Sequence, residues 1–209
     1  MSEKYYLISL LLIVLSIGVF FFSFEKRKPQ AREIVTLAVM CAIAVASRAA
    51  FMMIPHFKPM TGIIMITGME FGPAAGFLTG AISGFVSNFI FGQGPWTPWQ
   101  MFAYGVAGCL AGILAKKGII SGQKKMPSAV AGILTVVCIV GPLLDTATLF
   151  MASSAMNVES ASAIYLSGLP VNIIHGAATF LTIFILGKPI TEKLDRIKIK
   201  YGMMEEDES

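Results

Sequence analysis

Long uncharged runs separated by short basic segments dominate the pattern of hydrophobic and polar positions along the 209 residues. The first run, residues 5–24, is long enough to cross a hydrocarbon core of about 30 Å. A basic cluster follows this run rather than preceding it, and no small-residue cleavage site comes after it, which argues against a cleaved signal peptide. We therefore expect an uncleaved anchor with its N-terminus outside.

Six further helices are expected between residues 33 and 187. The glycine-rich stretch 61–91 is too long for one span, and its break at Gly72-Pro73 predicts one helix that enters and another that returns. The sequence thus predicts an all-α integral membrane protein with a six-helix bundle and one extra N-terminal transmembrane helix. The expected spans of the bundle are 33–54, two helices within 61–91, 100–115, 128–150 and about 165–187.

Basic residues are confined almost completely to three short segments, which hold thirteen of the sixteen Lys and Arg. These segments must be cytoplasmic if the positive-inside bias holds, and the seven expected spans place all three on one side. The chain is therefore expected to be a multi-pass protein of a cell membrane. The residues are Lys26, Arg27, Lys28 and Arg32; Lys116, Lys117, Lys124 and Lys125; and Lys188, Lys193, Arg196, Lys198 and Lys200.

Composition excludes a soluble globule, because 56% hydrophobic and 13% charged residues leave too little polar surface to coat one. The net charge of +4 meets anionic lipid at the cytoplasmic surface, so no nucleic-acid partner is expected. Cys41, Cys109 and Cys138 lie in apolar runs without metal-ligand spacing, so no metal site is expected. We divide the chain into an anchor and basic linker (1–32), one membrane domain (33–187) and a cytoplasmic tail (188–209). The tail has amphipathic spacing that suggests a helix on the inner membrane surface.

Ionisable and polar side chains at membrane depth are costly and are therefore candidate binding residues. Arg48 lies roughly 9 Å and Asp145 roughly 7 Å below the external ends of their helices. These two groups either contact a ligand or neutralise one another, and both can hold. Asn172, His175 and Thr179 share one helix face, and the histidine is either a ligand contact or a hydrogen-bonded packing group. Asn88 and Tyr104 complete this set, which lies mainly in the external half.

The external turn "FGQGPWTPWQ" combines flexible glycines, rigid prolines and two tryptophans. Trp96 and Trp99 either anchor the chain at the membrane edge or stack on a planar or bulky ligand above the polar groups. In the second case, Gln93 and Gln100 would orient that ligand.

A ladder of small residues runs along the expected helix 33–54, where alanine recurs every four residues. Such a pattern lets a second helix approach closely, and Arg48 lies on the opposite side of the helix. A similar ladder at Ala103, Ala107, Ala111 and Ala115 shows that these patterns often serve internal packing. The first ladder comprises Ala38, Ala42, Ala46 and Ala50.

These features together resemble the substrate-binding (S) components of energy-coupling factor (ECF) vitamin transporters, over roughly residues 33–187. The resemblance implies capture of a vitamin-like solute from outside by a subunit in a prokaryotic plasma membrane. It also implies association with a transmembrane coupling (T) subunit that carries two ATPases, contact of Ala38, Ala42 and Ala46 with that subunit, and toppling to deliver the ligand. The tryptophan loop looks most like members assigned to cobalamin or related corrinoids. The span at 5–24 departs from the usual six helices.

Three functional hypotheses remain at this point. A binding and translocation subunit would need no catalysis and no cofactor, and the absence of a G-x-x-x-x-G-K-[ST] motif places nucleotide hydrolysis on another protein. A membrane enzyme would use His175 with Asp145 or Glu70 as acid and base, but no catalytic motif supports it. A self-sufficient secondary carrier would be expected to show two similar halves, and no convincing repeat is present.

Overall fold

The computed structural model describes residues 31–152 and 157–202, together with Leu7, Leu11, Val14 and Gly18 as single helical positions. Within these residues every regular element is a helix. Apart from those four positions, the expected first span lies outside the described residues. The helices are α2 (Ala31–Ala50), α3 (Met60–Phe71), α4 (Pro73–Phe91), α5 (Thr97–Lys116), α6 (Lys125–Thr135), the π-helix η1 (Val136–Val140), α7 (Gly141–Ala152) and α8 (Val158–Lys200).

Five helical segments are long and apolar enough to cross a membrane, which makes the chain a multi-pass membrane protein. They are α2, α4, α5, the continuous stretch from α6 to α7, and α8. The sixth segment, α3, has 12 residues and covers only about 18 Å, well short of a 30 Å hydrocarbon core. The six-plus-one arrangement of spans is therefore not confirmed.

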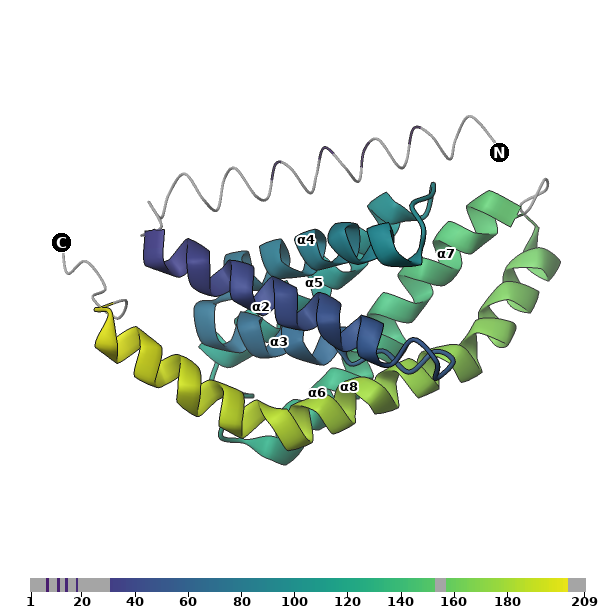
Figure 1. Cartoon of the computed structure of the whole chain (residues 1–209). Coiled ribbons are helices and arrows are strands. Elements are labelled where there is room, and N and C mark those ends of the chain that lie inside the picture. The colour runs from purple at the N-terminus through teal and green to yellow at the C-terminus, as the bar shows by residue number, and fades with distance from the viewer. Residues whose placement is uncertain are drawn as a thin grey trace.

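Helix α3 occupies the middle of the bundle, where it contacts α2, α4, α5 and α8 (Figure 1). Every residue from Met60 to Gly68 is buried, so this helix is surrounded by the protein on all sides, and its polar residues Thr61 and Thr67 are buried with the rest. Gly72, with a φ of 88°, then reverses the chain directly into α4. The positive φ explains why a glycine stands at this corner, and Pro73 follows at the first position of α4, where its missing N–H costs nothing.

Glycines bring the backbones of α3, α4 and α5 into direct contact. A Cβ atom on Gly76 or Gly68 would overlap the carbonyl oxygen of Gly108, and one on Gly108 would overlap the carbonyl oxygen of Gly76. We call this three-helix contact the glycine seam. The buried alanines 103, 107 and 111 of α5 add to the core, so the second alanine ladder serves internal packing.

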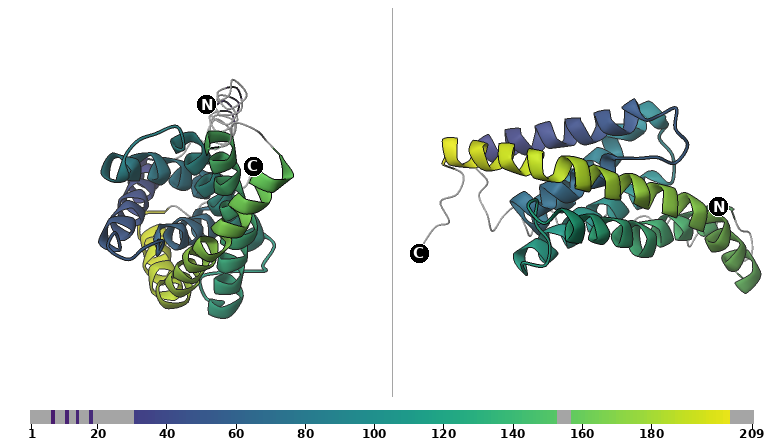
Figure 2. Two further views of the ribbon diagram at one scale, coloured as in Figure 1. Left: turned by 90° about the vertical axis from the view of Figure 1, so that its right-hand side faces the viewer. Right: turned by 90° about the horizontal axis from the view of Figure 1, so that it is seen from below.

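Helix α8 runs along one side of the whole bundle and curves over its length (Figures 1 and 2). It begins with a capping box between Asn157 and Ser160 and contains Pro170 and Pro189. The helix crosses the expected domain boundary at 187–188 without a break. Leu194, in the expected tail, is buried in the core, so the apolar face of this segment packs on the protein rather than lying on a membrane surface.

The two ends of the bundle differ in chemistry. One end carries residues 51–59 and the turn 92–96, and we call it the turn end. The opposite end carries the basic segments around Lys116, Lys124 and Lys198, and we call it the basic end.

At the basic end, Nζ of Lys198 lies 3.0 Å from Oε2 of Glu70 and donates to the Glu70 carbonyl oxygen at 2.7 Å. Thr191 donates to Oε1 of the same carboxylate, so Glu70 ties the end of α3 to α8.

Candidate functional site

Arg48 is held at the turn end by two polar side chains of α4. Its Nη1 donates to Oδ1 of Asn88 at 3.0 Å and also to the hydroxyl oxygen of Ser87. The guanidinium carbon lies 4.3 Å from the centre of the Phe91 ring, a cation–π distance. Arg48 is only 5% exposed, yet its Nε has no hydrogen-bond partner in the described part of the chain. The charge is therefore fixed in place with one donor unused.

Asn88 connects this arginine to the turn between α4 and α5. Its Nδ2 donates to the hydroxyl oxygen of Thr97 at 3.0 Å and to Oε1 of Gln100 at 2.8 Å. The amide orientation is fixed by these partners, because only the oxygen can accept from Arg48 and only the nitrogen can donate to two oxygens. Asn88 is 1% exposed, and loss of its amide would leave several buried groups without partners.

Thr97 holds the turn itself in shape. Its hydroxyl donates to Oε1 of Gln93 at 2.9 Å and accepts from Asn88 and from the backbone N–H of Gly94. Gln93 in turn donates to the carbonyl oxygen of Phe85 at 3.0 Å. Gln93 is thus a turn-stabilising residue, with its amide oxygen and nitrogen both engaged within the protein.

A hollow of about 280 Å³ lies beside this turn, between the start of α5 and helix α7. Trp96 contributes a partly exposed ring (38%), and Gly94 allows that ring to lie against the backbone, since a Cβ there would overlap the indole. Gln100 also lines the hollow, and its amide nitrogen donates to no other described residue. The lining residues are Trp96, Gln100, Leu144, Ala147, Thr148 and Met151.

Trp99 has a different position from Trp96. It is 4% exposed, and its ring centre lies 5.8 Å from that of Phe150 on α7. Trp99 belongs to a small core cluster with Ala147, beneath the hollow rather than along it. The structure therefore assigns the two tryptophans of the turn to separate environments, one exposed beside the hollow and one packed below it.

Asp145 pairs with Asn172 across α7 and α8, and not with Arg48. Nδ2 of Asn172 donates to Oδ2 of Asp145 at 2.8 Å. The ion pair between Arg48 and Asp145 considered from the sequence is absent from residues 31–152 and 157–202, because each charge is held by an amide on its own side of the bundle. Gly141 and Gly168 make room for this pair, since a Cβ on either would crowd the Asn172 or Asp145 side chain.

The π-helix η1 sets the orientation of α7, which carries Asp145. The N–H of Gly141 bonds to the carbonyl oxygen of Val136, five residues back, and Pro142 follows without an N–H. The extra residue in this turn rotates α7 relative to α6. Periodicity in the sequence does not reveal such a bulge, although Gly141-Pro142 marks its location.

His175 lies deep in the bundle and bonds to Thr61 of α3, with 2.8 Å between Nε2 and the hydroxyl oxygen. The Tyr104 ring stands edge-on to the imidazole at 6.2 Å, and the Tyr104 hydroxyl is buried without a partner in the described residues. His175 bonds to neither Asp145 nor Glu70 within that part of the chain, and both carboxylates have other partners. The geometry therefore favours a hydrogen-bonded packing role for His175.

The candidate residues thus form three groups rather than one cavity. Arg48, Asn88, Gln93 and Gln100 share a network at the turn end; Asp145 and Asn172 form a pair; and Tyr104 and His175 meet in the interior. Sequence reasoning missed Ser87 and Thr97, which hold the first group together. Serine and threonine are common in membrane helices, but Thr79, Ser83 and Ser87 recur every four residues on one buried face of α4, and that period was a usable signal.

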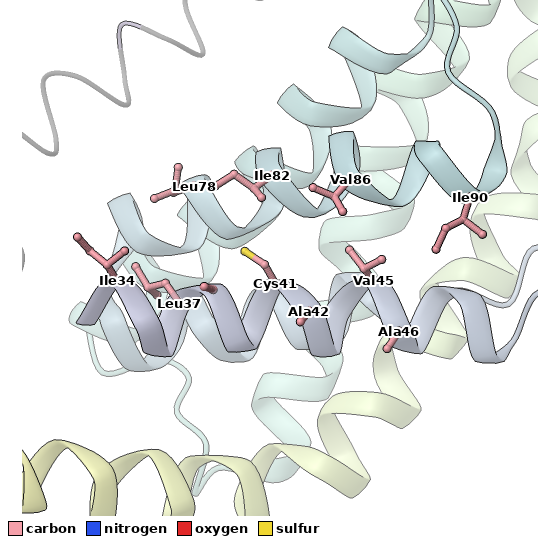
Figure 3. Close-up of a pocket in the computed structure, with 11 residues that line it drawn as sticks. Ile34, Leu37, Cys41, Ala42, Val45, Ala46, Leu78, Ile82, Val86 and Ile90 are labelled. Atoms are coloured by element: carbon pink, nitrogen blue, oxygen red, sulfur yellow. The ribbon is translucent and has the colours of Figure 1, made fainter. Parts of the chain in front are cut away.

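A larger, apolar groove separates α2 from α4 and has a volume of about 590 Å³ (Figure 3). Ala38, Ala42 and Ala46 line it on the α2 side, and all three are exposed. Side chains of α4, including Ile82 and Val86, point toward α2 along its length (Figure 3). The first alanine ladder therefore borders an open groove, whereas the second is filled.

Comparison with known proteins agrees with the helical membrane fold. Two similar proteins, both named UPF0397 protein, come from strains of Clostridium perfringens. They are 26% identical (strain SM101) and 23% identical (strain ATCC 13124) over 194 residues, covering 88% of this chain and 99% of each relative. No solved structure matches the chain. A model of the family described as "ECF-type riboflavin transporter, S component" matches residues 28–196, and the chain therefore belongs to this family of ECF transporter S components.

Proposed function

We propose that the chain is the substrate-specific membrane subunit of an ECF importer and that it captures a planar heterocyclic vitamin of flavin size. The matched family consists of transporter subunits and not of enzymes. The observation that carries the proposal is the network at the turn end. It runs from Arg48 through Asn88 to Gln100, which presents an unused amide donor to the hollow beside the exposed Trp96 ring.

The size of the hollow favours a single heterocycle over a corrinoid. Ligand pockets typically measure about 300–1,000 Å³, and the hollow of about 280 Å³ is just below that range. An aromatic ring beside an amide suits a flat molecule with polar edges. The indole can stack on the face of such a molecule, and the amide can hydrogen-bond to its edge. The name of the family gives riboflavin as the first ligand to test. The cobalamin-type assignment has no support from these observations.

The other polar groups take subsidiary roles in this proposal. Arg48, Asn88 and Gln93 hold the turn and Gln100 in place, and Trp99 supports the turn from below. Asp145 on α7 and Asn172 on α8 would receive a polar edge of the ligand as it enters deeper. Tyr104 and His175 lie deeper in the bundle and would support the site through packing. All ten residues predicted from the sequence thus keep a place in the proposed site, in contact with ligand or in support of it.

The proposed partners are a transmembrane coupling subunit and two ATPases, in a prokaryotic plasma membrane. Ala38, Ala42 and Ala46 would contact the coupling subunit, because the groove that they border admits a helix at close range. Ala42→Trp should then abolish ATP-driven uptake and leave ligand binding intact. Val39→Trp, on the exposed face of α2 outside the groove, is the matched control.

Titration of riboflavin into the full-length chain in lipid nanodiscs tests the proposal. We expect saturable quenching of flavin fluorescence, weakened by Gln100→Ala and by Trp96→Ala, and no comparable binding of cobalamin. Reconstituted alone in liposomes, the chain should not accumulate ligand on a proton gradient. Efficient uptake under that gradient would instead establish a secondary carrier, and tight cobalamin binding would restore the corrinoid hypothesis.

A further inference from the structure

The groove between α2 and α4 is left open by the described residues although it is apolar and long. On α2 it extends from Ile34 to Ala46, and on α4 from Leu78 to Ile90, which is about 18 Å on each helix. Ile82, Val86 and Ile90 are 39%, 40% and 55% exposed along one wall. In a membrane, a hollow of about 590 Å³ between two helices is filled either by lipid chains or by a further helix, and the small residues on its α2 wall favour a helix.

Chain length restricts which element can fill it. The apolar run 5–24 ends six residues before α2 begins at Ala31. The six residues 25–30 reach about 20 Å at most, and packed helices stand about 8–10 Å apart, so a helix formed by this run can pack against the start of α2 but cannot lie far from it. Ile34, at the mouth of the groove, is one turn from that start.

The described positions of the run mark one face that is exposed, so the opposite face is the one available to dock. Leu7, Leu11 and Val14 are helical and 69%, 55% and 58% exposed, and at 100° per residue they share one face. Ser9, Ser16 and Ser23 recur every seven residues in the sequence, and on one continuous helix they would be about 170° from that exposed face. Such a helix would have its small side chains opposite the exposed face, where close approach of another helix is possible.

We propose that residues 5–24 form a helix that docks into the groove between α2 and α4, antiparallel to α2, with its serine face against the ladder Ala38, Ala42 and Ala46. Counting outward from the linker places Ser16 near the depth of Ala38 and Ser9 near that of Ala46. Small residues on the docked helix and on α2 then let the backbones of these two helices approach closely. The apolar side chains of α4 would pack against the side of the docked helix.

Docking of this segment would compete with the coupling subunit, a step that rests on the proposed function. Both occupants use the same three alanines. A six-residue tether gives the segment an effective concentration on the order of millimolar, so the partner must displace it to bind. The extra helix would then keep the alanine face of the free subunit from pairing with a second copy until the coupling subunit arrives.

Disulfide trapping in the full-length chain tests the docking without any transport assay. Cys41, Cys109 and Cys138 are first replaced by alanine, and Ser16→Cys is combined with Ala38→Cys, or Ser9→Cys with Ala46→Cys. The matched control joins Ser16→Cys to Val39→Cys, at the same depth but on the exposed face of α2, where Val39 is 53% exposed. A second control joins Val14→Cys, on the exposed face of the run, to Ala38→Cys.

Trypsin provides the readout, because Lys26 and Arg27 lie in the linker and cleavage there separates the run from α2 unless a disulfide joins them. In nanodiscs holding one chain each, we expect several-fold more joined fragment for both test pairs than for either control. Equal yields in test and control pairs, or no joining in both test pairs, would overturn the proposal. Disulfides between two copies through Ala38→Cys in liposomes would assign the groove to a dimer. Since no coupling subunit or ligand is present, failure of the proposed transport function would leave this result unchanged.

Discussion

Nη1 of Arg48 lies 3.0 Å from Oδ1 of Asn88, and this hydrogen bond joins a buried charge on α2 to the amide that also holds Gln100. A charge 5% exposed in a membrane bundle is stable only where polar partners replace water. Asn88 supplies such a partner, and its hydrogen bonds to Thr97 and Gln100 also fix the turn 92–96 relative to Arg48. The position of the proposed ligand donor therefore depends on one amide.

Asn88→Ala should weaken flavin binding about tenfold to a hundredfold, because removal of a buried hydrogen-bonding group leaves its partners unsatisfied at a cost of about 1–3 kcal/mol. Fluorescence titration in nanodiscs measures the change. Thr182→Ala is the control, since that hydroxyl is buried but bonds only within its own helix, to the Ala178 carbonyl oxygen. Unchanged affinity in the Asn88 variant would remove the network from the site.

Gly94→Ala should displace the Trp96 indole, because the added Cβ would overlap the ring. We expect weaker flavin binding and a shift of tryptophan emission toward that of a more hydrated indole, with the thermal midpoint nearly unchanged. Gly187→Ala provides the comparison, since its nearest neighbour, Ile183, would be 3.7 Å from the new atom. If both variants bind equally well, Trp96 does not contact the ligand.

Gly108→Ala should destabilise the protein strongly, because the new methyl group would meet the backbone of α4, which cannot rotate away. Overpacking typically costs about 1–3 kcal/mol, and a clash with backbone is at the upper end or beyond. Gly132→Ala is the matched variant, since its Cβ would meet the mobile end of Ile183 at 2.7 Å. The thermal midpoints in detergent should fall much further for Gly108; equal values would argue against the glycine seam.

Lys198→Met should lower stability by about 3–5 kcal/mol, because it leaves the Glu70 carboxylate buried with its cationic partner removed. The two side chains are only 11% and 8% exposed. Lys188→Met breaks the ion pair with Glu192, whose partners are 47% and 46% exposed, and should cost less than about 1 kcal/mol. Chemical denaturation of both variants checks the difference, which high salt should not abolish. A similar loss in the two would show that burial at Glu70 is unimportant.

Much of the helical layout was predictable, because the length of an apolar run indicates a membrane helix and a glycine or proline between two runs indicates where one helix ends. Gly72-Pro73 marks the corner between α3 and α4, where it was expected. The lengths were less accurate: α2 ends at Ala50 rather than at residue 54, and α3 is too short to span. Helix α8 continues past Pro189, where Thr191 and Lys198 bond to Glu70 of α3 and Leu194 joins the core, and these tertiary contacts cannot be read from local sequence.

The site was predictable to the extent that its members are conspicuous at membrane depth. Arg48 and Asn88 were identified in this way and Gln100 from the external turn, and the structure brings the three together. The hydrogen-bond partners of these residues could not be predicted. Choosing between Asn88 and Asp145 as the partner of Arg48 requires knowledge of which helices are neighbours. Packing of Trp99 against Phe150 likewise depends on α7, whose rotation is set by a π-helix that leaves little trace in periodicity.

The contact of Gly68, Gly76 and Gly108 has a mechanical consequence. With no side chains between them to deform, the three helices behave as a stiff lever rather than as separate rods. Helix α5 is about 30 Å long, with the tryptophan turn at one tip and Gly112 against the Gly72-Pro73 corner near the other. A small tilt imposed at the tryptophan turn should therefore reach the Gly72-Pro73 corner with little loss.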